Sequence, residues 1–346
     1  RVHDLAKNNV TTDLVTHLLL GLLPVSCFLA ALVYLDSYKL VPIRRVLLVI
    51  ALGCCTAALS YPVSLFWLDL AGVDFTTYTR FIAPAFEEGL KALVIVILIR
   101  LNRVGFLVDA AILGFAVGAG FAILENLYFL RIVPDTQLGT WIVRGFGTAI
   151  MHGGATAIFA ITSHTIIGRH PTIGNAAYLP GLIVAIIAHS VYNHFFFAPI
   201  INTLAVLLTL PLLLVAVFDR SEKAVADWLG MGFDADTELL ELINSGEFST
   251  SRVGLYLHSL KEKFAGPIVA DLLCYLRLHT ELSIRAKGLL MMRESGFDSP
   301  VGEETRSKLE ELRYLEGSIG ATGILAMRPF MEMSQKDLWK IYVLSD

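Results

Sequence analysis

Long apolar segments dominate this chain of 346 residues up to about position 218. Each segment is close to the ~20 residues that an α-helix needs to cross the hydrocarbon core of a bilayer. Hydrophobic residues make up 55% of the chain and charged residues 17%, which is too apolar a balance for a soluble globular protein. The sequence therefore predicts an all-α, multi-pass bundle in the lipid bilayer with about seven spans. The expected spans are Leu14–Leu35, Val46–Leu68, Phe81–Ile99, Gly105–Leu130, Ile142–Ile167, Ala177–Pro199 and Ile200–Phe218.

Charge divides the chain at the end of the last span. Residues 1–218 carry 12 Lys and Arg against 10 Asp and Glu, and residues 219–346 carry 15 against 21, so the net charges are +2 and −6. We expect a transmembrane bundle in 1–218 and a helical domain in 219–346, where apolar residues recur at helical spacing. Basic residues are scattered and the second part is acidic, so the sequence predicts no nucleic-acid binding. The second domain shows no catalytic pattern, and we expect it to regulate activity or to support a homo-oligomer.

Basic residues in the loops predict the orientation in the cell membrane. The loops after the first, third and fifth spans carry Lys39, Arg44, Arg45, Arg100, Arg103 and Arg169. The alternate loops carry only Arg80, Arg131 and, at a helix start, Arg144. Because basic loops stay on the cytoplasmic side, we expect the domain in 219–346 to be cytoplasmic.

Polar and ionisable residues inside four of the spans fall at one depth. They are Glu87, Glu88, Glu125, His152 and His189, with Asn193 one helical turn after the last. At a rise of ~1.5 Å per residue they lie within ~6 Å of one another in depth, in the extracytoplasmic half of the expected topology. A charged group in hydrocarbon is costly. The pattern therefore predicts one buried aqueous site open to the extracytoplasmic side.

The spacing within these helices suggests roles. Glu87 and Glu88 lie four and three residues before Lys91, so either carboxylate can pair with the ammonium while the other faces the cavity as a base. His189 and Asn193 share one helix face and can hold an oxyanion between them. Glutamate and histidine together can polarise a water molecule, with or without a metal ion.

Four short blocks, in order over residues 81–197, resemble the PrsW-type intramembrane proteases, distant relatives of the CaaX-processing and bacteriocin-processing membrane proteases. The blocks are Glu87 to Lys91; Asp109, Gly114, Gly118 and Gly120 into Phe121, Glu125, Asn126 and Tyr128; Arg144, His152 and Thr156; and His189 with Asn193. The resemblance implies cleavage of a membrane-anchored protein substrate, in some members an anti-sigma factor, near its extracytoplasmic face. Glu87 matches the catalytic glutamate of the CaaX branch, which implies that Glu88 pairs with Lys91.

Two mechanisms of peptide hydrolysis remain open at this point. In the first, Glu125, His152 and His189 bind Zn²⁺, because one carboxylate and two imidazoles are typical ligands of hydrolytic zinc, and Glu87 is the general base. In the second, no metal is present and Glu87 with Glu125 activates the water. The resemblance leaves the choice between the two open, because the CaaX branch has histidine where this chain has Glu125. His189 is then either a metal ligand or, with Asn193, part of the oxyanion clamp.

Two other classes of function fit the bare residues. Buried glutamate and histidine serve proton-coupled transporters, but the sequence shows no internal repeat, and beyond the cluster only Asp109 and Lys91 continue toward the cytoplasmic side. The third class is a non-catalytic membrane scaffold that docks partners through the second domain. The intramembrane endopeptidase is the favoured interpretation.

Overall fold

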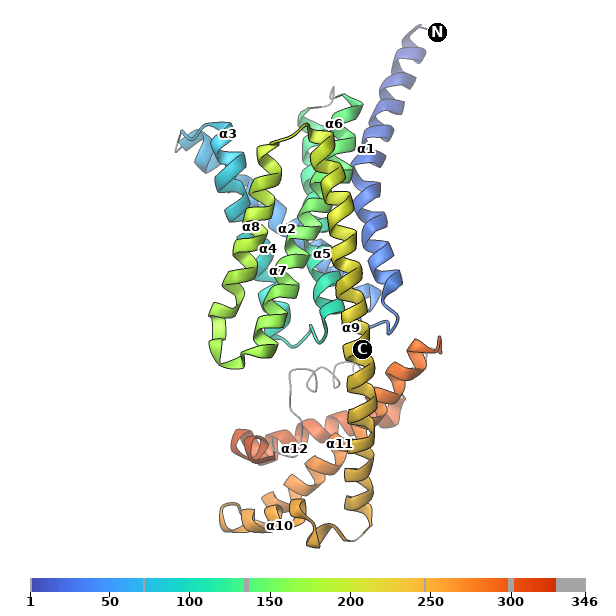
Figure 1. Ribbon diagram of the computed structural model, residues 1–346, viewed down its shortest axis with the longest axis vertical. Helices are drawn as coiled ribbons and strands as arrows, with labels where there is room; N and C mark the ends of the chain where they lie inside the picture. The colour runs from blue at the N-terminus through green and yellow to red at the C-terminus, as the bar shows by residue number, and fades with distance from the viewer. Residues whose placement is uncertain (1, 71, 134–136, 246, 298–301, 328–346) are drawn as a thin grey trace. The chain divides into compact units, whose positions relative to one another are not determined.

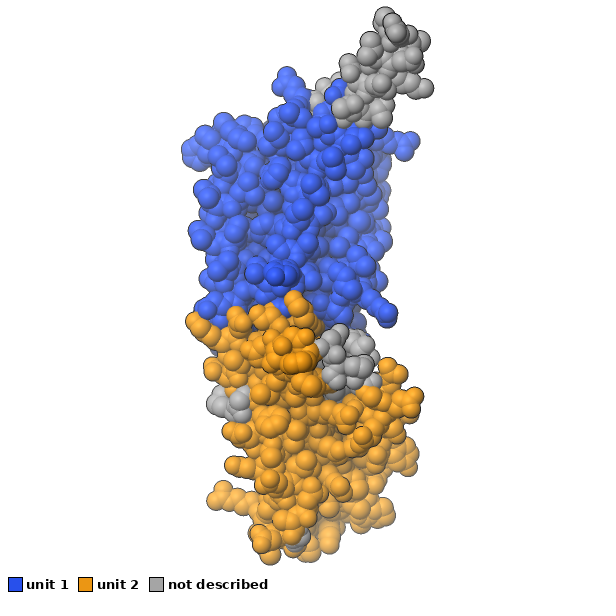
Figure 2. All heavy atoms as spheres, turned by 90° about the vertical axis from the view of Figure 1, so that its right-hand side faces the viewer, with its two compact units in different colours: residues 1–36, 41–221 blue, residues 37–40, 222–346 orange. Residues whose placement is uncertain are grey.

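The computed structural model describes residues 2–70, 72–133, 137–245, 247–297 and 302–327, and the regular structure in these ranges is entirely helical. The chain forms two compact units (Figure 2). The first, the membrane unit, holds the residues up to 36 and 41–221, and the second holds 37–40 and the chain from 222 onward. This division falls inside a helix at Ser221, whereas charge and hydropathy place it after Phe218.

The helices of the membrane unit follow the apolar segments closely (Figure 1). They are α1 (Val2–Leu35), α2 (Ile43–Leu65), α4 (Ala83–Arg100), α5 (Leu107–Ile132), α7 (Ala149–Arg169), α8 (Leu179–His194) and the first part of α9 (Pro199–Asn244), linked in part by α3 (Phe75–Thr77), α6 (Leu138–Ile142) and the 3₁₀ segment η4 (Pro171–Tyr178). Within the described ranges, six helical segments are long and apolar enough to cross a membrane. Helix α4 is not among the six, because Glu87, Glu88, Lys91 and Arg100 make it too charged. The expectation of seven spans therefore stays a prediction.

In the part of the chain that the structure describes, three π-helical segments adjoin the regular helices. They are η1 (Phe66–Leu70), η2 (Tyr78–Ile82) and η3 (Val143–Thr148). Segment η2 runs directly into α4 and η3 directly into α7. π-turns are often found at functional sites. Here two of them lie at the N-terminal ends of α4 and α7, so these two helix ends are candidates for a functional site.

Helix α5 is the centre of the membrane unit, and 83% of its most apolar stretch is buried, against 22% for α1. It packs against α1, α2, α4 and α7, and α1 and α8 lie on opposite sides of α5 and α7 (Figure 1). A β-carbon on Gly118 would lie 2.2 Å from the carbonyl oxygen of His152, and one on Gly120 would lie 2.1 Å from that of Ile50. Glycine therefore lets the backbones of α5 and α7 touch beside His152.

The second unit is built from the later part of α9, α10 (Arg252–Ser259), α11 (Gly266–Glu294) and α12 (Glu303–Met327), with the 3₁₀ segments η5 (Glu247–Thr250) and η6 (Leu260–Glu262). Leucines dominate its core, among them Leu272, Leu276 and Leu312. These helices agree with the periodicity of the sequence. The sequence predicts an apolar span that ends at Phe218, and in the structure the helix that contains it, α9, continues beyond the span to Asn244.

Candidate functional site

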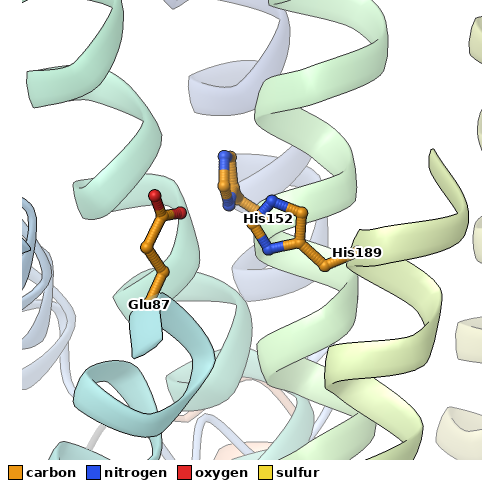
Figure 3. Close-up of side chains that lie close together, drawn as sticks. All are labelled: Glu87, His152 and His189. Atoms are coloured by element: carbon orange, nitrogen blue, oxygen red, sulfur yellow. The ribbon is translucent and has the colours of Figure 1, made fainter. Parts of the chain in front are cut away.

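Three helices bring ionisable side chains together inside the membrane unit. Glu87 from α4, His152 from α7 and His189 from α8 turn their polar ends toward one another (Figure 3). One potential ligand atom from each lies within 4.8 Å of the others, and both histidines are buried. The structure thus joins residues that are up to 102 positions apart (189 − 87) in one small site.

Glu88 pairs with Lys91, as the sequence predicts. The Lys91 Nζ donates to Glu88 Oε1 at 2.5 Å, and both side chains are buried. The same oxygen lies 2.9 Å from Nδ1 of His189. Because a carboxylate only accepts hydrogen bonds, Nδ1 of His189 carries the proton and Nε2 keeps a free lone pair. Glu88 therefore orients His189 in the way that carboxylates orient metal-binding histidines.

His152 has a charged neighbour at each ring nitrogen. Its Nδ1 lies 3.0 Å from Lys91 Nζ, and its Nε2 lies 3.3 Å from Glu125 Oε2. An ammonium group only donates, so Nδ1 accepts from Lys91 and the proton is on Nε2, facing Glu125. The rings of His152 and His189 meet edge to face with centroids 4.7 Å apart.

Glu125 lies between a cation and an imidazole. Its Oε2 is 3.5 Å from Arg144 Nη2 and 3.3 Å from His152 Nε2. Both Oε2 and Nη2 are buried, yet neither makes a hydrogen bond of ordinary geometry within the described residues. The side chain of Glu125 is 34% exposed although Oε2 itself is buried, and Glu87 is likewise only half-buried.

Formal charges in the cluster do not balance. Glu87, Glu88 and Glu125 carry three negative charges, Lys91 and Arg144 carry two positive charges, and the two imidazoles are neutral in the arrangement above. Among the described residues, Glu87 makes neither an ion pair nor a hydrogen bond through its carboxylate. Uncompensated charge in a low-dielectric interior is costly. The site therefore favours an additional proton or a bound cation.

The donor groups suit a zinc-type ion. Zinc bonds to nitrogen and oxygen are about 2.0–2.2 Å long, so two ligand atoms on a tetrahedral ion lie about 3.3 Å apart. Glu125 Oε2 and His152 Nε2 have that separation, and an ion bound between them would take the place of the proton on Nε2. The sequence predicts Glu125 as the carboxylate ligand beside the two histidines, whereas the three ligand atoms that lie within 4.8 Å of one another among the described residues belong to Glu87, His152 and His189. The residues present therefore fit the metal, with two carboxylates available for one position.

Asn193 makes a contact that the sequence did not indicate. Its Nδ2 donates to the carbonyl oxygen of Thr79 at 2.9 Å, and Ser190 Oγ donates to that of Arg80 at 2.6 Å. Both carbonyls belong to η2, the segment that leads into α4. Asn193 therefore joins α8 to the helix that carries the two glutamates, and its oxyanion role stays a prediction.

The outer members of the cluster were noted in the sequence without a role. Arg144 and Asn126 appear only as motif residues, and the contact of Lys91 with His152 was not foreseen. A cation inside an apolar segment is by itself a signal of function, which could have selected Arg144. Asp109 caps the start of α5 by accepting from the backbone N–H groups of Gly105 at 2.8 Å and Phe106 at 3.1 Å. It therefore has a structural task, which weakens the transporter interpretation.

Fold and site together define a multi-pass helical membrane protein with a buried carboxylate–imidazole centre of the hydrolase type. Residues 41–218 match the PrsW family of intramembrane metalloproteases, and the chain belongs to that family. The family makes the chain an intramembrane protease, as the resemblance implies. No curated protein and no solved structure matches the chain. Helix α1 precedes the matched residues entirely.

Proposed function

We propose that this protein is an intramembrane endopeptidase that hydrolyses a peptide bond of a membrane-anchored protein near its extracytoplasmic face. The observation that carries the proposal is the different environment of two adjacent glutamates. Glu88 is neutralised by Lys91, whereas Glu87 has no such partner among the described residues and faces two histidines within 4.8 Å. An unpaired carboxylate beside imidazoles is the arrangement that general-base hydrolysis needs.

The proposed metal ligands are Glu125, His152 and His189, with zinc as the ion. When bound, such an ion polarises the scissile carbonyl and makes a water molecule more acidic. Glu88 fixes the ring of His189 so that Nε2 is free to bind. Glu125 Oε2 and His152 Nε2 lie 3.3 Å apart, so both can reach one ion once it has displaced the proton on Nε2.

Glu87 is the proposed general base. Its carboxylate accepts the proton of the attacking water and later transfers it to the leaving amine. Lys91 keeps Glu88 ionised, so the proton goes to Glu87 rather than to the adjacent carboxylate. Asn193 is the proposed oxyanion donor, for which its amide must exchange the carbonyl of Thr79 for the substrate.

The proposed substrate is a transmembrane protein of the anti-sigma factor type, which some members of the family cleave. A transmembrane helix hides its carbonyls in hydrogen bonds. The substrate must therefore unwind locally before a peptide bond can reach the site.

The first test replaces the two glutamates. Glu87→Gln and Glu88→Gln should each abolish cleavage of a membrane-anchored reporter while the protein still inserts and folds. Asp69→Asn is the matched control, because Asp69 is an exposed carboxylate in η1 of the same unit. Normal cleavage by both glutamate variants would rule out the protease mechanism proposed here.

Metal analysis decides whether Glu125 or Glu87 is the carboxylate that binds the ion. Glu125→Gln, His152→Ala and His189→Ala should each lower zinc content together with activity, whereas Glu87→Gln should keep zinc and lose activity. If Glu87→Gln loses zinc and Glu125→Gln retains it, the ligands are Glu87, His152 and His189. An active preparation without a stoichiometric transition metal would leave Glu87 and Glu125 as a metal-free water-activating pair.

The proposed orientation places residues 219–346 in the cytoplasm and the site in the extracytoplasmic half. The asymmetry of basic residues between alternate loops supports it. A reporter fused after Asp346 should be protected from protease added outside intact cells. Its digestion from outside would reverse the orientation.

A further inference from the structure

We propose that Arg144 and Asn126 are positioning residues for Glu125, and that α1 completes the site by holding Asn126 in place. This inference rests on the proposed function, because it assigns the support of one of its metal ligands. Arg144 lies on η3 and Asn126 on α5, and neither has a role in the mechanism above.

The guanidinium of Arg144 is fixed by three neighbours. Its Nε donates to Asn126 Oδ1 at 2.9 Å, and its Cζ lies 4.0 Å from the centre of the Phe129 ring. Its Nη2 lies 3.5 Å from Glu125 Oε2. The hydrogen bond and the ring set the plane of the guanidinium, and that plane presents Nη2 to the carboxylate.

Asn126 connects this cation to α1. Its Nδ2 donates to the carbonyl oxygen of Gly21 at 2.8 Å, and its side chain is buried. The amide therefore uses its oxygen for Arg144 and its nitrogen for the backbone of α1. With both ends engaged, the amide cannot rotate without losing a buried hydrogen bond.

Glycine allows α1 to come this close. A β-carbon on Gly145 would lie 1.7 Å from the carbonyl oxygen of Leu20, and one on Gly21 would lie 3.0 Å from the Trp141 ring. The backbones of α1 and η3 are thus in direct contact beside Arg144. Because α1 precedes the residues matched by the family, part of the support for the site comes from outside the family region.

The consequence of this arrangement lies at Glu125. Its side chain is 34% exposed and would otherwise be free to turn toward open space. The contact with Arg144 Nη2 holds the carboxylate with Oε2 facing His152 Nε2 at 3.3 Å. Residues that support metal ligands in this manner typically contribute 10–100-fold to metal affinity or activity.

The test uses the purified full-length protein and two readouts, turnover of a membrane-anchored reporter and zinc affinity against a chelating dye. Arg144→Gln should lower kcat and zinc affinity by about 10–100-fold with KM nearly unchanged. Arg144→Lys keeps the positive charge but lacks the planar guanidinium group, so its kcat and zinc affinity should lie between those of Arg144→Gln and the wild type. Asn126→Ala should also lower kcat and zinc affinity, by smaller factors than Arg144→Gln does. Arg131→Gln is the control, because Arg131 is an exposed cation near the end of α5.

Coupling between the two residues separates positioning from mere packing. If Asn126 acts through Arg144, the loss in Arg144→Gln combined with Asn126→Ala should be smaller than the product of the single losses. Unchanged zinc affinity and kcat in Arg144→Gln would overturn the inference, and so would multiplicative losses. Should Arg144→Gln fail to fold, normal values in folded Asn126→Ala would have the same force.

Zinc affinity also separates the inference from the proposed function. A wild-type protein that binds zinc but cleaves no peptide would contradict the protease mechanism, and Arg144→Gln would still be judged by its affinity. A wild-type protein that cleaves normally, with an Arg144→Gln variant equal to it in both readouts, would contradict only the inference. A wild-type protein that neither binds zinc nor cleaves would overturn both.

Discussion

Each unit of the molecule contains a buried lysine, and the two lysines are used differently. In the membrane unit, Lys91 Nζ lies 2.5 Å from Glu88 and 3.0 Å from a ring nitrogen of His152, and the Glu88 side chain is 1% exposed. In the second unit, Lys287 Nζ lies 2.8 Å from Asp236, whose side chain is 23% exposed. Glu88 is shielded from solvent and has an imidazole neighbour, whereas Asp236 is still partly exposed to solvent.

The comparison shows what distinguishes an ion pair at a site from an ion pair in a scaffold. Asp236 also accepts a short hydrogen bond from Ser283, and Lys287 lies 5.3 Å from the Trp228 ring. These contacts join α9 to α11, and among the described residues Lys287 is the titratable group paired with the carboxylate oxygen of Asp236. Glu88, by contrast, shares one oxygen between Lys91 and His189. The pair in the membrane unit therefore determines the protonation of neighbours as well as the packing of helices.

Removing each lysine tests this difference most directly. Lys91→Met leaves Glu88 as a buried uncompensated charge, so we expect a loss of about 3–5 kcal/mol in stability and no cleavage. Lys287→Met leaves Asp236, which can hydrate, so we expect a loss of about 1–2 kcal/mol and wild-type kcat. Thermal unfolding in detergent and reporter cleavage measure both effects. Equal turnover by the two variants would show that Lys91 is only structural.

Glycines extend the comparison to helix packing. Gly118→Ala places a β-carbon 2.2 Å from the His152 carbonyl oxygen, where backbone must move. We expect a loss of about 1–3 kcal/mol and reduced cleavage, because His152 moves with that backbone. In α11, a β-carbon on Gly288 meets nothing within 4 Å, so Gly288→Ala should stabilise the second unit by about 0.5–1 kcal/mol. Unfolding curves that rank the variants in the opposite order would contradict this interpretation of the packing.

Truncation tests whether the second unit is needed for chemistry. Ser221 Oγ accepts from the Val108 N–H at the start of α5 at 3.1 Å, so a chain ending after Lys223 keeps this contact. We expect it to retain measurable hydrolysis in detergent, with a changed rate or oligomer size by size-exclusion chromatography. A chain ending after Arg220 loses the contact and should unfold at a lower temperature. Complete loss of activity in a folded, monodisperse chain ending after Lys223 would make the second unit part of the catalytic machinery.

The smallest expected effect is a pH dependence in the second unit. Burial raises the pKa of Glu316 above its ordinary value of 4.5, and the Tyr275 hydroxyl donates to its Oε1 at 3.5 Å. An acid with a higher pKa in the folded state stabilises that state when protonated. This contribution is therefore full below pH 4.5 and is lost as the pH rises through the raised pKa.

Replacing the carboxyl group of Glu316 should remove this loss of stability at higher pH. Glu316→Gln should raise the stability of the second unit at pH 7 by at most about 1 kcal/mol, since the side chain is only half-buried. Glu311→Gln, an exposed position on the same helix, should change nothing. Urea unfolding of the full-length variants at pH 4 and pH 7 measures the difference. A larger gain at pH 4 than at pH 7 would contradict the sign.

Much of this arrangement could be predicted from the sequence because the signals are strong and local. Apolar segments of spanning length locate the helices, and ionisable residues at equal depth locate the cluster of Glu87, Glu125, His152 and His189. The pairing of Glu88 with Lys91 is confirmed; helix spacing allowed either glutamate to pair with the lysine, and the resemblance to the family selected Glu88.

The rest depends on how helices approach one another, which periodicity does not report. The contact of Lys91 with His152 requires α4 and α7 to meet at one height, which the hydropathy of each helix does not report. The use of Asn193 on the backbone of Thr79 depends on η2, and no sequence pattern indicates π-helix there. The continuous helix α9 was missed because hydropathy marks the end of an apolar segment and not the end of a helix.

The π-helical segment η3 makes the spacing along the chain part of the site. Arg144 lies within it and His152 follows it, and both reach the same oxygen of Glu125. A π-turn accommodates one more residue than an α-turn, and each residue turns an α-helix by ~100°. A deletion of one residue between Arg144 and His152 that restored a regular helix would rotate one of the two away from α5. Variation in length is thus tolerated less here than variation in side chain, and an insertion or deletion would separate the two contacts even if every polar residue were kept.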